Sequence, residues 1–230
     1  MNDFNKNVVE WSAKVVKYCH QIATNPAYDM NLTFYAFQSA PKENPDLLVL
    51  GINPAGEYSY SDLYNNPAWR LTNEKQMTAD VLIKENPFFH SHETWPIWKN
   101  LRKSFTNERM NNMLNSSMYM NFIYFNSPNI DILLSKKQGK EVFNKCCDFS
   151  LELITNIIRP KQILCLGTGG CFDKLSIVQK EVLLADGKRL LTKGKLLDIP
   201  IYGIPHPSGA RTSDANRKRI GELLIKNFCL

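Results

Sequence analysis

The chain has 230 residues, of which 43% are hydrophobic and 22% are charged, and its formal net charge is +6. These values are ordinary for a folded, soluble protein and suit one α/β domain spanning residues 1–230. No apolar window approaches membrane-spanning length and no secretory-type stretch opens the chain, so we expect a cytoplasmic protein with no membrane partner. The charge permits a nucleic-acid partner, but it fits a solvated basic surface equally well.

The predicted elements alternate between helices and apolar strands. Apolar residues at helical spacing predict a first helix over 8–22, which ends before Asn25-Pro26. Residues 34–37 form a short edge segment, and 47–50 read as a buried parallel strand. Residues 56–93 show no clear periodicity of apolar residues.

The second half of the chain continues this alternation. Further strands are predicted at 118–125, 163–166 and 201–204, and further helices at 97–105, at 142–157 and after a capping Ser213. Asp186-Gly187 indicates a hairpin or loop excursion before the last strand. We therefore expect a three-layer α/β/α sandwich around a central four-stranded, mainly parallel sheet.

Six cysteines occur without a C-x-x-C pair, at positions 19, 146, 147, 165, 171 and 229. The adjacent Cys146 and Cys147 fall in the predicted helix 142–157 and Cys165 falls in a predicted strand, so we expect reduced and mostly buried thiols. The spacing of zinc and iron–sulfur ligands is missing. We expect no metal and no cofactor.

Two short motifs directly follow predicted strands. Gly51-Ile52-Asn53-Pro54-Ala55-Gly56 comes after strand 47–50, and His206-Pro207-Ser208-Gly209-Ala210-Arg211 comes after strand 201–204. Ligands of open α/β sheets bind beyond the carboxyl ends of the strands. We therefore expect the Asn53 amide and the His206 imidazole to flank one site.

Each of these two residues also has a structural interpretation. The Asn53 carbonyl can orient a water and its NH₂ group can donate, but asparagine, proline and glycine are also turn formers. His206 lies in a loop stiffened by flanking prolines, and a preorganised donor is worth roughly 3 kcal/mol to catalysis. A lone histidine is more often a surface or core residue. The backbone N–H groups around Ser208, ahead of a helix, suit a phosphate.

Other candidates surround these motifs. Asn126 ends the second predicted strand, where its amide suits a nucleobase edge or a simple Asx turn. Phe88 or Phe89 offers a face on which a base could stack, worth about 1–3 kcal/mol, or else plugs the core. Gly167 begins a tight turn after the third strand and lines the expected site.

Taken together, these residues resemble the uracil-DNA glycosylase superfamily. Gly51-Ile52-Asn53-Pro54 is similar to its first motif in the mismatch-specific and single-strand-selective branches, and His206-Pro207-Ser208 is similar to its last motif, H-P-S. Asn126 falls where the family carries its base-recognising asparagine. The order of the motifs and their placement after strands match from residue 45 to the end of the chain.

The chain departs from the family at two positions. Asn53 replaces the aspartate of the most active branch, which puts high turnover in doubt. Ala55 stands where that branch uses a tyrosine to exclude the thymine methyl, so the resemblance implies a broader range of bases.

The resemblance implies hydrolysis of the N-glycosidic bond of uracil or a related deaminated base in DNA, after the nucleotide flips out of the duplex. Asn53 then positions water, His206 donates to the departing base, and Asn126 reads its edge. The base pocket is implied at Gly51, Ile52, Pro54, Ala55, Gly56, Gly167 and either Phe88 or Phe89. DNA contacts are implied at Pro207, Ser208, Gly209, Ala210, Arg211 and Arg217, in a monomer.

Two other functions stay open. A non-catalytic member would bind nucleic acid or a nucleotide without releasing a base, with salt-dependent DNA affinity. An unrelated α/β hydrolase or nucleotide-binding enzyme would match these motifs by chance, although the chain has no G-x-S-x-G nucleophile elbow.

Overall fold

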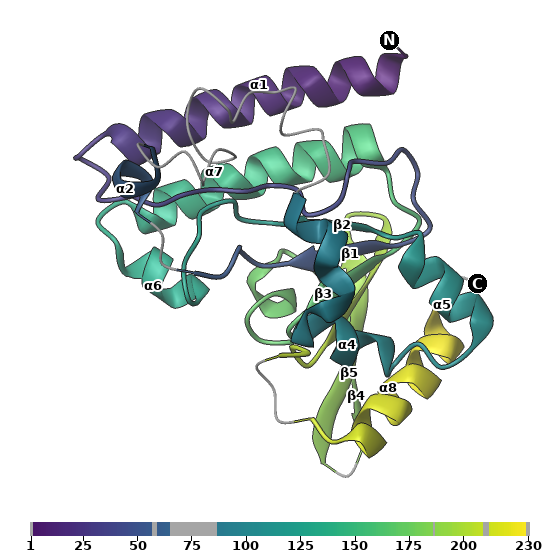
Figure 1. Cartoon of the computed structure of the whole chain (residues 1–230). Helices are drawn as coiled ribbons and strands as arrows, with labels where there is room; N and C mark the ends of the chain where they lie inside the picture. Colours follow the sequence, from purple (N-terminus) through teal and green to yellow (C-terminus); the bar gives the residue numbers. More distant parts are fainter. Residues whose placement is uncertain (1, 57–58, 65–86, 186, 209–211, 229–230) are drawn as a thin grey trace. The chain divides into compact units, whose positions relative to one another are not determined.

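The computed structural model describes residues 2–56, 59–64, 87–185, 187–208 and 212–228. The chain forms two compact units that are interleaved along the sequence. The first comprises Met1–Glu43, Ile52–Asn86 and Met120–Arg159, and the second comprises Asn44–Gly51, Pro87–Tyr119 and Pro160–Leu230. Figure 1 shows both units, with labels on most of the helices and strands.

A six-stranded sheet organises the second unit, with the strand order β2-β1-β3-β6-β5-β4. Its strands are β1 (Leu48–Gly51), β2 (Met118–Asn121), β3 (Ile163–Leu166), β4 (Val178–Ala185), β5 (Lys188–Leu196) and β6 (Ile199–Ile204). The boundary between the two units falls inside strand β2. Met118 and Tyr119 belong to the second unit, and Met120 and Asn121 belong to the first. Three of the four apolar runs predicted as strands are confirmed as β1, β3 and β6.

The central strands β1, β3 and β6 run parallel. Cys165 of β3 is in register with Leu50 of β1 on one side and with Gly203 of β6 on the other. Their carboxyl ends therefore share one edge of the sheet. The strand order reverses at β1, because β2 lies on one side of it and β3 on the other. Open α/β sheets bind their ligands at such a switch point.

The sheet has six strands rather than the expected four. The additional strands, β4 and β5, form an antiparallel hairpin that continues onto β6, and the turn signal at Asp186-Gly187 had indicated this hairpin. Strand β4 lacks the buried apolar run of a central strand, since Val178, Val182 and Leu184 are 55%, 48% and 63% exposed.

Three α-helices and two 3₁₀ segments complete the described part of the second unit. They are Pro87–Thr94 and Phe172–Lys174 (both 3₁₀), α4 (Pro96–Arg102), α5 (Glu108–Asn115) and α8 (Asp214–Asn227). Ser213 caps α8 as predicted, accepting a hydrogen bond from the Asn216 N–H at 3.2 Å. Trp98 and Leu101 of α4 and Leu224 of α8 belong to one buried core with the strands.

Helices dominate the first unit. They are α1 (Asp3–Thr24), α2 (Tyr60–Tyr64), α6 (Ile130–Ser135) and α7 (Gly139–Glu152), which continues as a π-helical turn over Leu153–Ile158. The two long predicted helices are thus confirmed as α1 and α7, which lie side by side in Figure 1. The Trp11 indole N–H donates to the Phe149 carbonyl at 2.8 Å, and Lys14 pairs with Glu152.

The strand predicted over 118–125 ends early, at Asn121. Residues 122–125 are fully buried, but they pair only through an isolated antiparallel bridge between Phe34 and Phe125. The rings of these two residues lie 6.0 Å apart. The apolar run therefore reflects aromatic packing rather than a continuous strand. The edge segment predicted at 34–37 supplies the partner of this bridge.

The described cysteines agree with the expectation of reduced thiols. All five are free, four of them are buried, and Cys147 is partly exposed. Cys229 lies outside the described residues.

Candidate functional site

Three of the predicted site residues follow the parallel strands of the second unit. Gly51 ends β1, Gly167 follows β3, and His206 comes two residues after β6. The Gly167 N–H donates to the carbonyl of Ile204 at 2.9 Å. A Cβ atom on Gly167 would lie 3.8 Å from the Cβ of His206. Gly167 and His206 are therefore neighbours at the carboxyl edge of the sheet, and their role in a base site stays a prediction.

Asn53 ties two loops of the first unit together. Its Nδ2 donates to the Pro54 carbonyl and the Ser127 carbonyl, both at 2.9 Å, and lies 3.0 Å from Ser127 Oγ. The Ser127 N–H returns a bond to the Pro54 carbonyl at 3.0 Å. The NH₂ group is thus used in hydrogen bonds to the backbone of these two loops. The Asn53 carbonyl oxygen, on a half-buried side chain, accepts no hydrogen bond from the described residues.

Asn126 lies in the second of these loops and is oriented by the first. Its Nδ2 donates to the Ala55 carbonyl at 3.0 Å. Because only the nitrogen of the amide can donate, this bond distinguishes Nδ2 from Oδ1. The side chain is 4% exposed, and its Oδ1 has no hydrogen-bond partner among the described residues. A buried carbonyl oxygen without a donor costs about 1–3 kcal/mol. Asn126 therefore presents one oriented, unsatisfied acceptor.

Backbone geometry explains why the first motif needs its glycine. Gly56 has φ +115°, a conformation that L side chains rarely adopt. Further along the chain, the Ile123 N–H donates to the Ile52 carbonyl at 2.7 Å. Ile52 and Pro54 thus hold the motif through backbone bonds, while Ala55 supplies the carbonyl that orients Asn126.

His206 is held by its own loop. Its Nδ1 lies 3.4 Å from the Ser208 N–H, which donates to it, and 3.1 Å from Ser208 Oγ. The Asn100 side chain of α4 donates to the Pro207 carbonyl at 3.0 Å and anchors the loop to the helix. Sequence reasoning missed this role of Asn100 and the role of Ser127, because a small polar residue that bonds a backbone carbonyl leaves no pattern in the sequence.

Burial lowers the pKa of His206 below its usual value of 6.5. The imidazole is therefore neutral at pH 7. Because Nδ1 accepts from the Ser208 N–H, the single ring proton sits on Nε2. His206 can thus donate a hydrogen bond without carrying a positive charge.

Several predicted contact residues have other surroundings. Arg217 pairs with Asp214 through Nη1, its side chain is 15% exposed, and Lys103 contacts the same carboxylate at 3.0 Å. The hydrogen bond from Lys103 has the larger effect, and together with that from Arg217 it holds the pKa of Asp214 below its usual value. Arg217 is thus already paired within the chain, and its contact with DNA stays a prediction. Ser208 is exposed and Pro207 is buried.

Other predicted residues are described only in part. Phe88 and Phe89 begin the 3₁₀ segment Pro87–Thr94, and the structure describes their backbone alone. Gly209, Ala210 and Arg211 lie outside the described residues.

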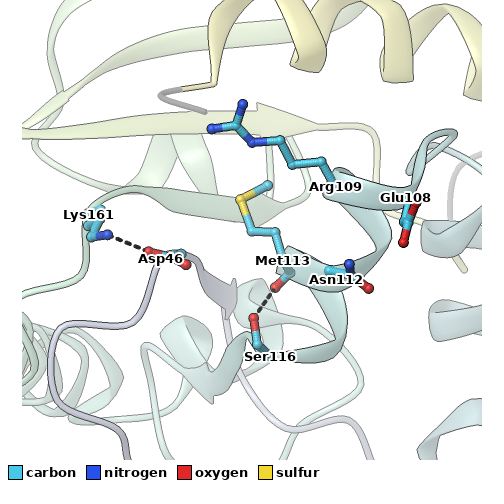
Figure 2. Close-up of a pocket in the computed structure, with 7 residues that line it drawn as sticks. All are labelled: Asp46, Glu108, Arg109, Asn112, Met113, Ser116 and Lys161. Atoms are coloured by element: carbon cyan, nitrogen blue, oxygen red, sulfur yellow. Dashed lines mark hydrogen bonds and ion pairs between the residues drawn. The ribbon is translucent and has the colours of Figure 1, made fainter.

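A cavity of about 660 Å³ lies elsewhere in the second unit (Figure 2). It is lined by Asp46, Glu108, Arg109, Asn112, Met113, Ser116 and Lys161. Asp46 precedes β1 and Lys161 precedes β3, so the cavity lies toward the amino ends of these strands. Asp46 and Lys161 form an ion pair there at 2.6 Å. None of the predicted site residues lines this cavity.

The described part of the chain lacks two features of other protein classes. No group of three or more His, Cys, Asp or Glu side chains is placed to hold a metal ion there. None of the helices in that part combines the length and apolarity of a membrane span.

Comparison with known proteins gives no assignment. No model of a known protein family matches this chain, and a search of curated proteins found no match. The resemblance to uracil-DNA glycosylases therefore rests on the motif residues alone.

We predict that Asn53→Asp destabilises the protein by about 2–3 kcal/mol at pH 7, since a carboxylate would replace a donor that faces two carbonyls. These oxygens should raise the pKa of the new carboxyl. Its protonated form can donate one bond, so the loss should shrink as the pH falls through that raised pKa. Urea unfolding at several pH values measures this. The exposed Asn112→Asp is the control and should stay within about 0.5 kcal/mol; equal effects of the two variants would contradict the account.

We predict that His206 titrates below pH 6.5, because burial penalises its charged form. Because the pKa of His206 is lower in the folded chain than in the unfolded chain, the unfolded chain takes up this proton at a higher pH. His206 should therefore reduce stability as the pH falls from 6.5 through the folded pKa, and cost nothing above that window. Titration of the His206 ring signal by NMR, assigned with His206→Gln, measures the value. A midpoint above 6.5 would refute the neutral imidazole.

Proposed function

We propose that this protein is a DNA glycosylase that hydrolyses the N-glycosidic bond of uracil or a related deaminated base. The observation that carries the proposal is the hydrogen-bonded pair of loops in the first unit. Asn53 donates to Ser127, and Asn126 donates to Ala55, so both NH₂ groups are used while neither amide oxygen accepts a bond from the described residues. Two acceptors are thus preorganised on neighbouring loops.

The Asn126 oxygen supports the choice of a deaminated base. Uracil and hypoxanthine carry an N–H on the Watson–Crick edge where cytosine and adenine carry a lone pair. An amide oxygen accepts from the former and repels the latter. Because the Ala55 carbonyl holds Nδ2, the amide cannot flip to accommodate the parent base without losing that bond. Buried polar groups left unpaired by a wrong substrate give strong discrimination.

Asn53 supports a reaction that needs no strong base. Its oxygen can accept from a water and hold it near the sugar, but an amide cannot remove a proton. This suits a dissociative path, in which the bond to the base breaks first and water captures an oxocarbenium-like sugar. The absence of a carboxylate at Asn53 then lowers the rate rather than abolishing the reaction.

The neutral imidazole of His206 supplies the complementary donor. As the base leaves, negative charge develops on its carbonyl oxygen. An Nε2–H fixed by the Ser208 loop can donate to that oxygen, and such preorganised donors typically contribute a factor of about 10²–10³ in rate.

The remaining expectations form part of this proposal. They are a three-layer α/β/α arrangement, stacking by Phe88 or Phe89, DNA contacts from the 207–211 loop, and a monomeric cytoplasmic enzyme without cofactor. The small Ala55 side chain supports a range of bases broader than uracil alone. A non-catalytic nucleic-acid-binding protein is the second candidate, favoured by the structural use of the Asn53 NH₂ group.

The test incubates the purified chain with oligonucleotides that contain one uracil, hypoxanthine or cytosine, and measures alkali-labile abasic sites. We expect release of the first two bases only. His206→Ala should lower the rate about 10²–10³-fold because it removes the donor to the departing base. Asn53→Ala should lower it as well, and the exposed Glu222→Gln on α8 is the control and should match the wild type.

Base release that persists in the double variant Asn53→Ala/His206→Ala would contradict the assigned roles. Salt-dependent DNA binding without release by the wild type would favour the non-catalytic candidate.

A further inference from the structure

Thr33 carries a second unsatisfied polar atom in the first unit. Its side chain is 1% exposed, and its hydroxyl has no hydrogen-bond partner among the described residues. A buried hydroxyl usually finds a partner, so each exception calls for an explanation. Thr33 belongs to no sequence motif, so its role could not be predicted from the sequence.

Local pairing places Thr33 opposite Asn126. The Asn126 N–H donates to the Thr33 carbonyl at 2.8 Å, and the Tyr35 N–H donates to the Tyr124 carbonyl at 2.7 Å. These two bonds flank the antiparallel bridge between Phe34 and Phe125. Residues directly opposite each other in an antiparallel pair share one face, with Cβ atoms about 4.5–5.5 Å apart. Thr33 and Asn126 therefore lie on the same face of this antiparallel pair.

The two unpaired atoms are chemically complementary. Asn126 Oδ1 can only accept, whereas the Thr33 hydroxyl can donate. A deaminated base presents a ring N–H next to an exocyclic C=O on its Watson–Crick edge. Recognition of that edge needs one acceptor and one donor. The natural donor, Asn126 Nδ2, is already bonded to the Ala55 carbonyl.

We infer that Thr33 is a specificity-determining residue that donates its hydroxyl hydrogen to the exocyclic carbonyl of the base while Asn126 accepts the ring N–H. This inference rests on the proposed function and names two buried oxygens, on residues that face each other across the bridge, that select its substrate. Both protein oxygens are shielded from solvent in the free chain. A base therefore reaches them by displacing what covers them, and it recovers two hydrogen bonds that the free protein lacks.

The experiment compares the wild type with Thr33→Val, which keeps the shape and removes the hydroxyl, and with Thr33→Ser, which keeps the hydroxyl. Substrates are oligonucleotides that carry uracil or 4-thiouracil, whose sulfur is a weaker acceptor at the position that Thr33 would contact. Thr33→Val should lower kcat/KM for uracil about tenfold, equivalent to about 1.4 kcal/mol. It should change kcat/KM for 4-thiouracil much less. Thr33→Ser should keep the preference of the wild type for uracil.

Thermal unfolding of the same variants separates specificity from structure. Replacing an unpaired buried hydroxyl by a methyl group should leave the melting temperature unchanged or raise it. Equal losses on both substrates, or a destabilised Thr33→Val, would show that the hydroxyl is structural, for example binding a buried water, and would overturn the inference. Unchanged kcat/KM would overturn it too. A wild type that releases neither base would instead refute the proposed function.

Discussion

The side-chain amide of Asn53 bonds to both neighbouring loops of the first unit, and the candidate site depends on that bond. Its Nδ2 donates to the Pro54 and Ser127 carbonyls, and this places Ala55 where its own carbonyl can accept from Asn126. Each amide is thereby fixed in one orientation by a backbone oxygen. The site thus gains preorganisation from ordinary hydrogen bonds that also stabilise the fold, and its two acceptors need no further alignment when a ligand arrives.

The groups that we assign to the chemistry are uncharged. Asn53 and Asn126 are amides, Thr33 is a hydroxyl, and burial keeps the His206 imidazole neutral at pH 7. Burial of neutral, oriented dipoles avoids the large desolvation penalty of a buried carboxylate. Such a set of groups favours a reaction that stabilises charge as it develops on the substrate. It disfavours a mechanism that must first generate a strong nucleophile.

Much of the second unit's sheet could be predicted from the sequence because burial and apolar pattern coincide there. Strands β1, β3 and β6 are short apolar runs that are almost entirely buried, and their carboxyl ends carry the motifs. The prediction failed where the apolar pattern of the sequence does not correspond to a buried strand. Strand β4 exposes its apolar residues, and residues 122–125 are buried without forming a strand.

The residues of the candidate site could be predicted only where an apolar run of the sequence marks them. Asn53, Asn126 and His206 could be found because each stands at the end of an apolar run. Ser127, Asn100 and Thr33 could not, because their roles depend on which carbonyl or amide lies across the chain from them. Three-dimensional pairing, rather than sequence spacing, determines those positions.

The central claim is that the Asn126 oxygen, oriented by the Ala55 carbonyl, accepts the ring N–H of an extruded base. The most direct measurement is a crystal structure of the protein bound to an oligonucleotide with a non-hydrolysable deoxyuridine analogue. The account predicts a hydrogen bond from the ring N–H of the base to Asn126 Oδ1. A base that remains stacked in the DNA, or one bound away from Asn126, would contradict it.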